Sequence, residues 1–308
     1  MNILLWHVHG SWTTAFVQGK HRYLVPVNDA RDAWGRGRAE TYNWPPSVEE
    51  RPLAEIRDVD VAIVQRPQEL DLVPPHVPVI YVEHNTPKGD VPNTRHPMAD
   101  RDDLIVAHVT HFNELFWDTG GTRTTVIEHG IVEPGARWTG EQERLAIVTN
   151  EPVRRGRVTG TDLFGRFAAV APLDVFGMGV AGLHGGRITA YDDPPQRAMH
   201  EMLAHRRAYL HLCRWTSLGL SLIEAMHMGM PVLGLATTEA VAAVPPDAGV
   251  LATRVDTLVE AAQWLLDEPA AAARLGARAR QVAVARYGLD RFLADWDRLL
   301  LEETCVSR

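Results

Sequence analysis

The chain has 308 residues, 45% of them hydrophobic, which is enough for two domains of roughly 140 residues, each with its own core. Its formal net charge of −8 at pH 7 argues against a general nucleic-acid or anionic-membrane surface. No apolar run approaches the length of a membrane span, the start MNILLWHVHG lacks a basic signal region, and the only cysteines are Cys213 and Cys305, so we expect a cytoplasmic protein.

The first part of the chain alternates buried-strand and helix patterns, which predicts a doubly wound parallel sheet. Residues 28–50 have no periodicity and are expected to form a loop. Exposed tryptophan beside arginine, as at Trp34, suits sugar or acceptor recognition, although tryptophans also close loops onto a core. Strands are predicted at 2–8, 23–27, 59–65, 78–83, 102–108 and 124–128, and a helix at 112–119.

Residues 129–135 (HGIVEPG) interrupt the alternation and are predicted to form a linker, after which the pattern restarts. Strands are predicted at 145–149, 173–176, 208–213 and 230–234, and near Val250. Helices are predicted from Thr161 and at 196–205, 221–228, 270–287 and 289–301. The sequence therefore predicts an α/β fold of two Rossmann-like domains facing across a cleft, and clefts between domains are common ligand sites. The predicted boundaries are 1–134, 135–286 and a C-terminal helix, 287–308.

The most informative stretch is 217–234, SLGLSLIEAMHMGMPVLG, which predicts a turn, a short helix ended by Gly229, and a buried strand. Ser221, Glu224 and His227 lie three residues apart and should form one polar stripe on an apolar helix. The amide groups at the start of such a helix favour phosphate, and a carboxylate one turn later can accept hydrogen bonds from both ribose hydroxyls. Equally compatible with the spacing is a structural role for Glu224.

Residues 215–232 (WTSLGLSLIEAMHMGMPV) resemble the donor-site signature of retaining GT-B glycosyltransferases, E-G-F-G-x-x-x-x-E-A-x-x-x-G-x-P-V. The resemblance implies that Glu224 binds the ribose of a nucleoside diphosphate sugar. Thr216 stands where the family has a glutamate that holds the donor sugar, so the sugar's identity is open. The donor-binding residues implied along this stretch are Thr216, Ser217, Leu218, Gly219, Leu220 and Ser221. In this family the last helix crosses back to the first domain.

His84 ends the strand PVIYVE and should lie at the carboxyl edge of the first sheet. It resembles the strand-end histidine of the same family, which lies near the transferred sugar, and we expect it to be catalytic. A loop histidine with a purely structural role is the alternative. The corresponding loop after the first strand is expected to approach the donor and the acceptor; its residues are His9, Gly10, Ser11 and Trp12.

Three arginines lie between the first strand and helix of the second domain, where related enzymes place an arginine and a lysine against the leaving diphosphate. Aligning the family's K-G-x-D-L on residues 159–163 (TGTDL) puts Thr159 at the lysine and Arg154 at the catalytic arginine. Arg155 and Arg157 are further donor-binding candidates, because guanidinium groups bind phosphate well. Glu239, in the loop after the following strand, is a supporting candidate.

Two further patterns are weaker. Residues 177–182 (GMGVAG) match the dinucleotide motif G-x-G-x-x-G, but the following HGG continues as loop rather than helix. Metal-ligand spacings are absent from the sequence, so we expect no metal and no cofactor beyond the nucleotide-sugar co-substrate.

The sequence thus predicts a glycosyltransferase that moves a sugar from a nucleoside diphosphate to an unidentified acceptor, with retention. Neither nucleic acid nor a membrane is expected as a partner, and the sequence leaves the oligomeric state open. A nucleotide-sugar binding protein without turnover is the main alternative, because of Thr216 and the missing lysine. The weaker alternative is a nicotinamide oxidoreductase, on the basis of residues 177–182.

Overall fold

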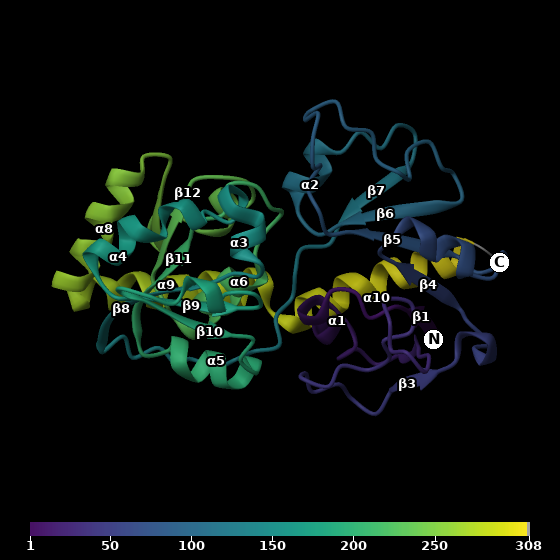
Figure 1. The fold of residues 1–308 in the computed structure, drawn as a ribbon. Helices are drawn as coiled ribbons and strands as arrows, with labels where there is room; N and C mark the ends of the chain where they lie inside the picture. The colour runs from purple at the N-terminus through teal and green to yellow at the C-terminus, as the bar shows by residue number, and fades with distance from the viewer. Residues whose placement is uncertain (307–308) are drawn as a thin grey trace. The chain divides into compact units, whose positions relative to one another are not determined.

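The computed structural model describes residues 1–306, which divide into two compact units. The first comprises Met1–Val132 and the C-terminal segment from Leu289, and the second comprises Glu133–Gly288 (Figure 1). Within the described residues, no helix combines the length and the apolar character that crossing a bilayer requires.

The first unit is built on a seven-stranded sheet of order β3-β2-β1-β4-β5-β6-β7, in which every neighbouring pair is parallel. The carboxyl ends of all its strands therefore lie along one edge. The strands are β1 (Asn2–Leu5), β2 (Arg22–Pro26), β3 (Val48–Arg51), β4 (Val61–Val64), β5 (Val79–Glu83), β6 (Leu104–His108) and β7 (Arg123–Val126). The helices are α1 (Gly10–Phe16), η1 (Leu53–Glu55), η2 (Pro67–Leu72), α2 (His111–Phe116) and α10 (Leu289–Val306).

The C-terminal helix α10 packs against α1 through an aromatic cluster. The rings of Phe16 and Trp296 have centroids 5.0 Å apart, and those of Trp12 and Trp296 are 5.6 Å apart. All three side chains are about 1% exposed. Burying aromatic groups of this size contributes a large share of a domain's hydrophobic stabilisation.

The second unit contains a six-stranded parallel sheet of order β10-β9-β8-β11-β12-β13. Its strands are β8 (Gln142–Val148), β9 (Leu173–Gly177), β10 (Ile188–Asp192), β11 (Arg206–His211), β12 (Val232–Leu235) and β13 (Gly249–Ala252). The helical segments are α3 (Pro152–Arg155), η3 (Gly156–Val158), η4 (Thr161–Leu163), α4 (Phe164–Val170), η5 (Ala181–Leu183), α5 (Gln196–Leu203), α6 (Leu220–Met228), α7 (Ala240–Ala243), α8 (Val255–Asp267) and α9 (Pro269–Tyr287).

Two parallel sheets flanked by helices confirm the predicted α/β class. Two local predictions were wrong. β3 begins inside the predicted loop 28–50, and it was missed because its sequence VEER has no apolar run. β10 was missed for a similar reason, since all its residues are at least partly exposed. The boundary between the two units falls between Val132 and Glu133, inside the predicted linker 129–135; at its start His129 and Gly130 are buried, and a Cβ on Gly130 would lie 2.3 Å from Phe292 Cβ.

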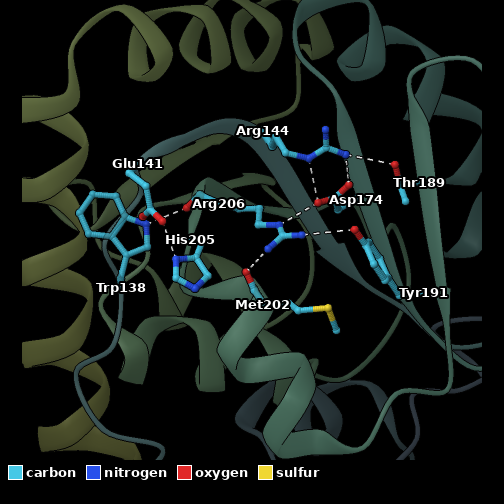
Figure 2. A network of polar contacts seen from close by, with 9 residues as sticks. All are labelled: Trp138, Glu141, Arg144, Asp174, Thr189, Tyr191, Met202, His205 and Arg206. Carbon is cyan, nitrogen blue, oxygen red and sulfur yellow. Dashed lines mark hydrogen bonds and ion pairs between the residues drawn. The ribbon is translucent and has the colours of Figure 1, made fainter.

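A buried ionic network joins the strands of the second sheet (Figure 2). Asp174 on β9 is 0% exposed and accepts hydrogen bonds from two arginines, Arg144 Nε at 3.0 Å and Arg206 Nε at 2.7 Å. Arg144 also donates to Thr189 Oγ1 at 3.1 Å, and Arg206 to Tyr191 OH at 3.4 Å. A charge buried this completely is stable only because its partners compensate for the lost water.

Candidate functional site

Helix α6 begins without a side-chain cap and ends at a left-handed glycine. Gly219 is its N-cap residue, with φ −72° and ψ 120°, and has no side chain to bind the first amides. Gly229, at φ +90°, ends the helix as predicted. Leu220 and Ser221 are partly exposed, whereas residues 222–228 are all buried. The first turn therefore directs its backbone N–H groups, at the positive end of the helix dipole, toward accessible space.

Glu224 is 5% exposed, and both of its carboxylate oxygens are held by α5. Gln196 Nε2 donates to Oε1 at 2.9 Å, and His200 Nε2 lies 3.1 Å from Oε2. The carboxylate is thus fixed by two side chains, as in the structural role that the sequence left open, and the sequence did not predict which residues hold it. Each carboxylate oxygen can accept two hydrogen bonds, so one acceptor position remains on each.

The three polar residues predicted to form one stripe on α6 have different partners. Ser221 Oγ accepts from Tyr209 OH at 2.9 Å. His227 Nδ1 lies 2.9 Å from Glu133 Oε2, and Arg280 NH1 donates to the other oxygen of Glu133 at 2.8 Å. The stripe therefore connects α6 to the rest of its unit at several points, and only Ser221 and Glu224 remain near the uncapped end.

The three arginines after β8 differ in their partners. Arg154 is 73% exposed and meets Glu151 at 3.4 Å. Arg157 is 76% exposed and pairs with Asp162 at 3.0 Å. Arg155 is partly buried, and its guanidinium makes no hydrogen bond or ion pair among residues 1–306. Arg155 is therefore the arginine most available to an anion, whereas the sequence alignment favours Arg154.

The arginine loop is tied to the segment that leads into α6. Arg214 donates its backbone N–H to Val158 O at 2.8 Å and its guanidinium to Asp162 at 2.6 and 2.9 Å. Gly160, at φ +77°, packs closely against the backbone of Leu212. A Cβ at this position would lie 2.2 Å from Leu212 O, so only glycine fits here. Thr159, at the family's lysine position, is 0% exposed and bonds to Gly156 O. It is therefore unavailable to a phosphate.

The remaining residues predicted along the donor stretch have different environments. Thr216 is partly exposed, while Ser217 and Leu218 are buried. Glu239 is 4% exposed and accepts from Arg286 NH2 at 3.1 Å at the start of α7. The carboxylate of Glu239 already has a structural partner, which favours a supporting role.

A cluster of histidines lies at the carboxyl edge of the first sheet. The rings of His9 and His84 have centroids 4.0 Å apart. Burial lowers the pKa of His9 to about 4, although Glu83 opposes this shift. Burial, followed by His9 and His129, holds the pKa of His84 well below its usual value. The pKa of His129 falls to about 3 through burial, His9 and Arg291. At neutral pH these imidazoles are uncharged.

Trp12 differs from the expectation that it contacts a ligand. It is 1% exposed and packs in the aromatic core, edge-on to His84 with ring centroids 5.1 Å apart. The size and apolar character of the Trp12 side chain account for this burial. Its indole packs against the ring of His84. Gly10 and Ser11 are partly exposed, with Ser11 Oγ 3.2 Å from Tyr42 OH.

Comparisons with known proteins agree with this geometry. The family model described as Glycosyl transferases group 1 matches residues 187–282, which include α5, α6 and Glu239. The matched residues all lie within the second unit. No curated protein sequence matches the chain.

Solved structures resemble this chain over nearly its whole length. AviGT4, a glycosyltransferase involved in avilamycin A biosynthesis, is 14% identical with a TM-score of 0.69, covering 99% of this chain and 98% of its own. The sucrose-phosphate synthase of Thermosynechococcus elongatus is 15% identical with a TM-score of 0.74 and 98% coverage of both chains. HepE of Anabaena, solved with UDP, is 13% identical with a TM-score of 0.71, covering 98% and 99%. These likenesses establish the GT-B fold.

Sequence reasoning missed several residues of the candidate site. Gln196 and His200 lie four residues apart on α5, a spacing that places both on one helix face. His211 ends β11 beneath Gly219, where a Cβ on the glycine would lie 3.2 Å from its ring. His211 Nε2 is buried without a partner among the described residues, and burial lowers its pKa to about 4. A polar residue at a strand end was the available signal for His211.

The dinucleotide-like motif has no structural support as a nucleotide site. Gly177 ends β9, and the motif is followed by η5, a 3-10 helix of three residues, and then by β10. No α-helix begins at this turn, so it lacks the aligned amides and dipole that bind a pyrophosphate in dinucleotide folds.

The histidine cluster should make the protein acid-sensitive. Histidines in the unfolded chain have pKa values near 6.5, whereas in the folded protein the pKa is about 3 for His129 and about 4 for His9. Below pH 6.5 the unfolded chain therefore binds more protons than the folded protein. The contribution of these histidines to the free energy of unfolding is fully present above pH 6.5. As the pH falls below 6.5, this free energy decreases by up to about 1.4 kcal/mol per pH unit for each group. Urea unfolding at about pH 7 and about pH 5 checks this.

The control for this prediction uses one buried and one exposed histidine. His129→Gln should reduce the loss of stability between the two pH values, whereas His76→Gln, at an exposed position, should leave it unchanged. Equal unfolding free energies for the unsubstituted protein at both pH values would contradict neutral burial of the cluster.

Proposed function

We propose that the protein transfers a sugar from a nucleoside diphosphate sugar to an acceptor hydroxyl, with retention of configuration. The observation that carries the proposal is Glu224, a carboxylate oriented by Gln196 and His200 one turn inside the uncapped start of α6. A pyrophosphate at the amide end of the helix and a ribose on Glu224 would together hold a nucleoside diphosphate. Because HepE was solved with UDP and with UDP-glucose, UDP is the first nucleotide to test.

The proposed chemistry depends on positioning and on stabilising the leaving group. As the bond between the sugar and the β-phosphate breaks, negative charge grows on the departing diphosphate. The amides of Leu220 and Ser221, with Arg155 or Arg154, would meet that charge. His84, a neutral imidazole with a buried Nε2 that has no partner among the described residues, would hydrogen-bond a hydroxyl of the transferred sugar.

No metal ion or cofactor is required by this proposal, since arginine and amide groups would neutralise the diphosphate. A cytoplasmic location is also proposed. Its support is that Cys213 and Cys305 are both free thiols, as expected in a reducing compartment.

Thr216 keeps a second candidate open: a nucleotide-sugar binding protein without turnover. The family's glutamate at this position offers two acceptor oxygens to the donor sugar, and a threonine offers one hydroxyl. Slow hydrolysis of a nucleoside diphosphate sugar, in a panel of such donors, would establish turnover. Binding without any hydrolysis or transfer would favour the second candidate.

A thermal-shift screen tests the proposed donor class directly. We expect UDP, GDP or TDP to raise the melting temperature, because a ligand at about 100 times its Kd stabilises the folded state by about 2.7 kcal/mol. Protection by NAD and by none of these nucleotides would overturn the proposal.

Substituting the three arginines separately should identify the phosphate ligand. Arg155→Ala should weaken UDP binding at least tenfold, since a hydrogen bond to a charged group contributes about 1.5–3 kcal/mol. Arg157→Ala is the matched control, because Arg157 is exposed and paired with Asp162. Calorimetric titration of each variant with UDP gives the order of effects. A larger loss for Arg157→Ala than for Arg155→Ala would contradict the assignment.

A further inference from the structure

The first unit contains a pocket of about 880 Å³ that lies apart from the residues of the proposed donor site. Its lining comes from the segments that follow the carboxyl ends of β2, β3 and β4, with β1 lying between β2 and β4 in the sheet. The lining residues are 26–29, 31, 34 and 35 after β2, 52–54 after β3, and 68, 71 and 72 after β4. Because the sheet is parallel, this is the edge at which β1 and β5 deliver His9 and His84. The volume lies within the range of small-molecule sites.

One wall of the pocket is the indole of Trp34, which is 41% exposed. Arg66 lies over this ring, 4.2 Å from its centroid, and is itself held by Glu69 at 2.7 Å. Asp32 Oδ1 accepts hydrogen bonds from the backbone N–H groups of Trp34 at 2.8 Å and Gly35 at 3.2 Å. These hydrogen bonds hold the loop in one conformation. The exposed indole of Trp34 is therefore an apolar surface that is in place before a ligand binds.

The polar lining is rich in uncommitted acceptors. Asp29, Gln68 and Asp71 line the pocket, and their side chains make no hydrogen bond or ion pair within residues 1–306. Arg31, the cation of the lining, donates to both oxygens of Glu50, at 3.0 and 3.2 Å. The pocket therefore offers two unpaired carboxylates and no unpaired cation, which favours hydroxyl donors and repels anions.

An apolar ring face beside hydroxyl donors is the chemistry of a sugar. We propose that this pocket binds a neutral sugar ring, which stacks on Trp34 and donates its hydroxyls to Asp29, Gln68 and Asp71. A phosphorylated sugar or a uronic acid would meet the two carboxylates unfavourably, and a hydrocarbon chain would leave them unsatisfied. If the protein transfers a sugar as proposed above, this pocket is the acceptor's binding subsite. The acceptor is then a neutral glycan or glycoside.

The experiment observes the indole N–H of Trp34 by NMR while maltose, cellobiose, chitobiose or glucuronic acid is added, without any nucleotide. Trp34→Ala assigns the signal. We expect at least one neutral disaccharide to shift it, and glucuronic acid to leave it unchanged. Asp29→Asn combined with Asp71→Asn should weaken that binding at least tenfold. Trp264→Ala is the control, because Trp264 is also 41% exposed but lies on α8 of the second unit.

The inference is overturned if none of the three neutral disaccharides shifts the Trp34 signal, or if only glucuronic acid shifts it. UDP binding is measured on the same samples and should be unaffected by Trp34→Ala. UDP binding without any sugar response refutes the pocket's role and leaves the proposed function intact. A sugar response without binding of any nucleoside diphosphate refutes the donor site and the acceptor role, while the sugar site itself stands.

Discussion

Replacing Asp174 by alanine should lower the free energy of unfolding by about 3–5 kcal/mol, because it leaves two arginines in the second sheet without their shared carboxylate. Asp174 is 0% exposed, and Arg206 is 6% exposed. Water cannot replace the lost partner around Arg206, whereas Arg144, whose side chain is 28% exposed, can be partly hydrated. Urea unfolding followed by circular dichroism measures the change.

The matched control for Asp174→Ala is Asp247→Ala. Asp247 pairs with Arg278 at 2.8 Å in the same unit, but the two side chains are 62% and 45% exposed. Exposed pairs contribute about 0–1 kcal/mol, so this variant should be nearly as stable as the unsubstituted protein. Equal effects of the two substitutions would show that Asp174 is not the centre of a desolvated network.

Replacing Glu224 by glutamine should weaken UDP binding about a hundredfold. The substitution keeps the size of the side chain but removes a charged acceptor, and each charge-assisted hydrogen bond to ribose contributes about 1.5–3 kcal/mol. Thr216→Ala, at a partly exposed position on the same stretch, should have a much smaller effect on the nucleotide. Calorimetric titration with UDP gives both affinities.

Glu224 also contacts Gln196 and His200, so its structural contribution must be measured separately. The melting temperature of Glu224→Gln without nucleotide reports the loss of those contacts. A lowered melting temperature with unchanged UDP affinity would mean that Glu224 is structural only. A larger loss of affinity for Thr216→Ala than for Glu224→Gln would show that the resemblance was aligned in the wrong register.

Local sequence signals predicted α6 well and its environment poorly. An apolar run between two glycines determines where the helix begins and ends, and Gly229 adopts the left-handed conformation expected of it. The contacts of Glu224 join α5 to α6, and those of Glu133 reach α6 and α9. Such pairings depend on how helices pack, which no spacing within one segment encodes.

The same limit applies to residues of one type. Trp12 and Trp34 both lie in or beside loops at strand ends, yet one is 1% exposed and the other 41%. Arg154, Arg155 and Arg157 are equivalent in sequence, and they differ because Asp162 pairs with Arg157 and Glu151 lies beside Arg154. Which of several similar side chains is available for binding is decided by the contacts that each one makes in the folded chain.

A crystal structure of the protein with UDP tests the central claim most directly. The account predicts the diphosphate at the backbone amides of Leu220 and Ser221, with both ribose hydroxyls donating to Glu224 while Gln196 and His200 keep their contacts. Density for UDP elsewhere, with Glu224 bonded only to Gln196 and His200, would contradict it.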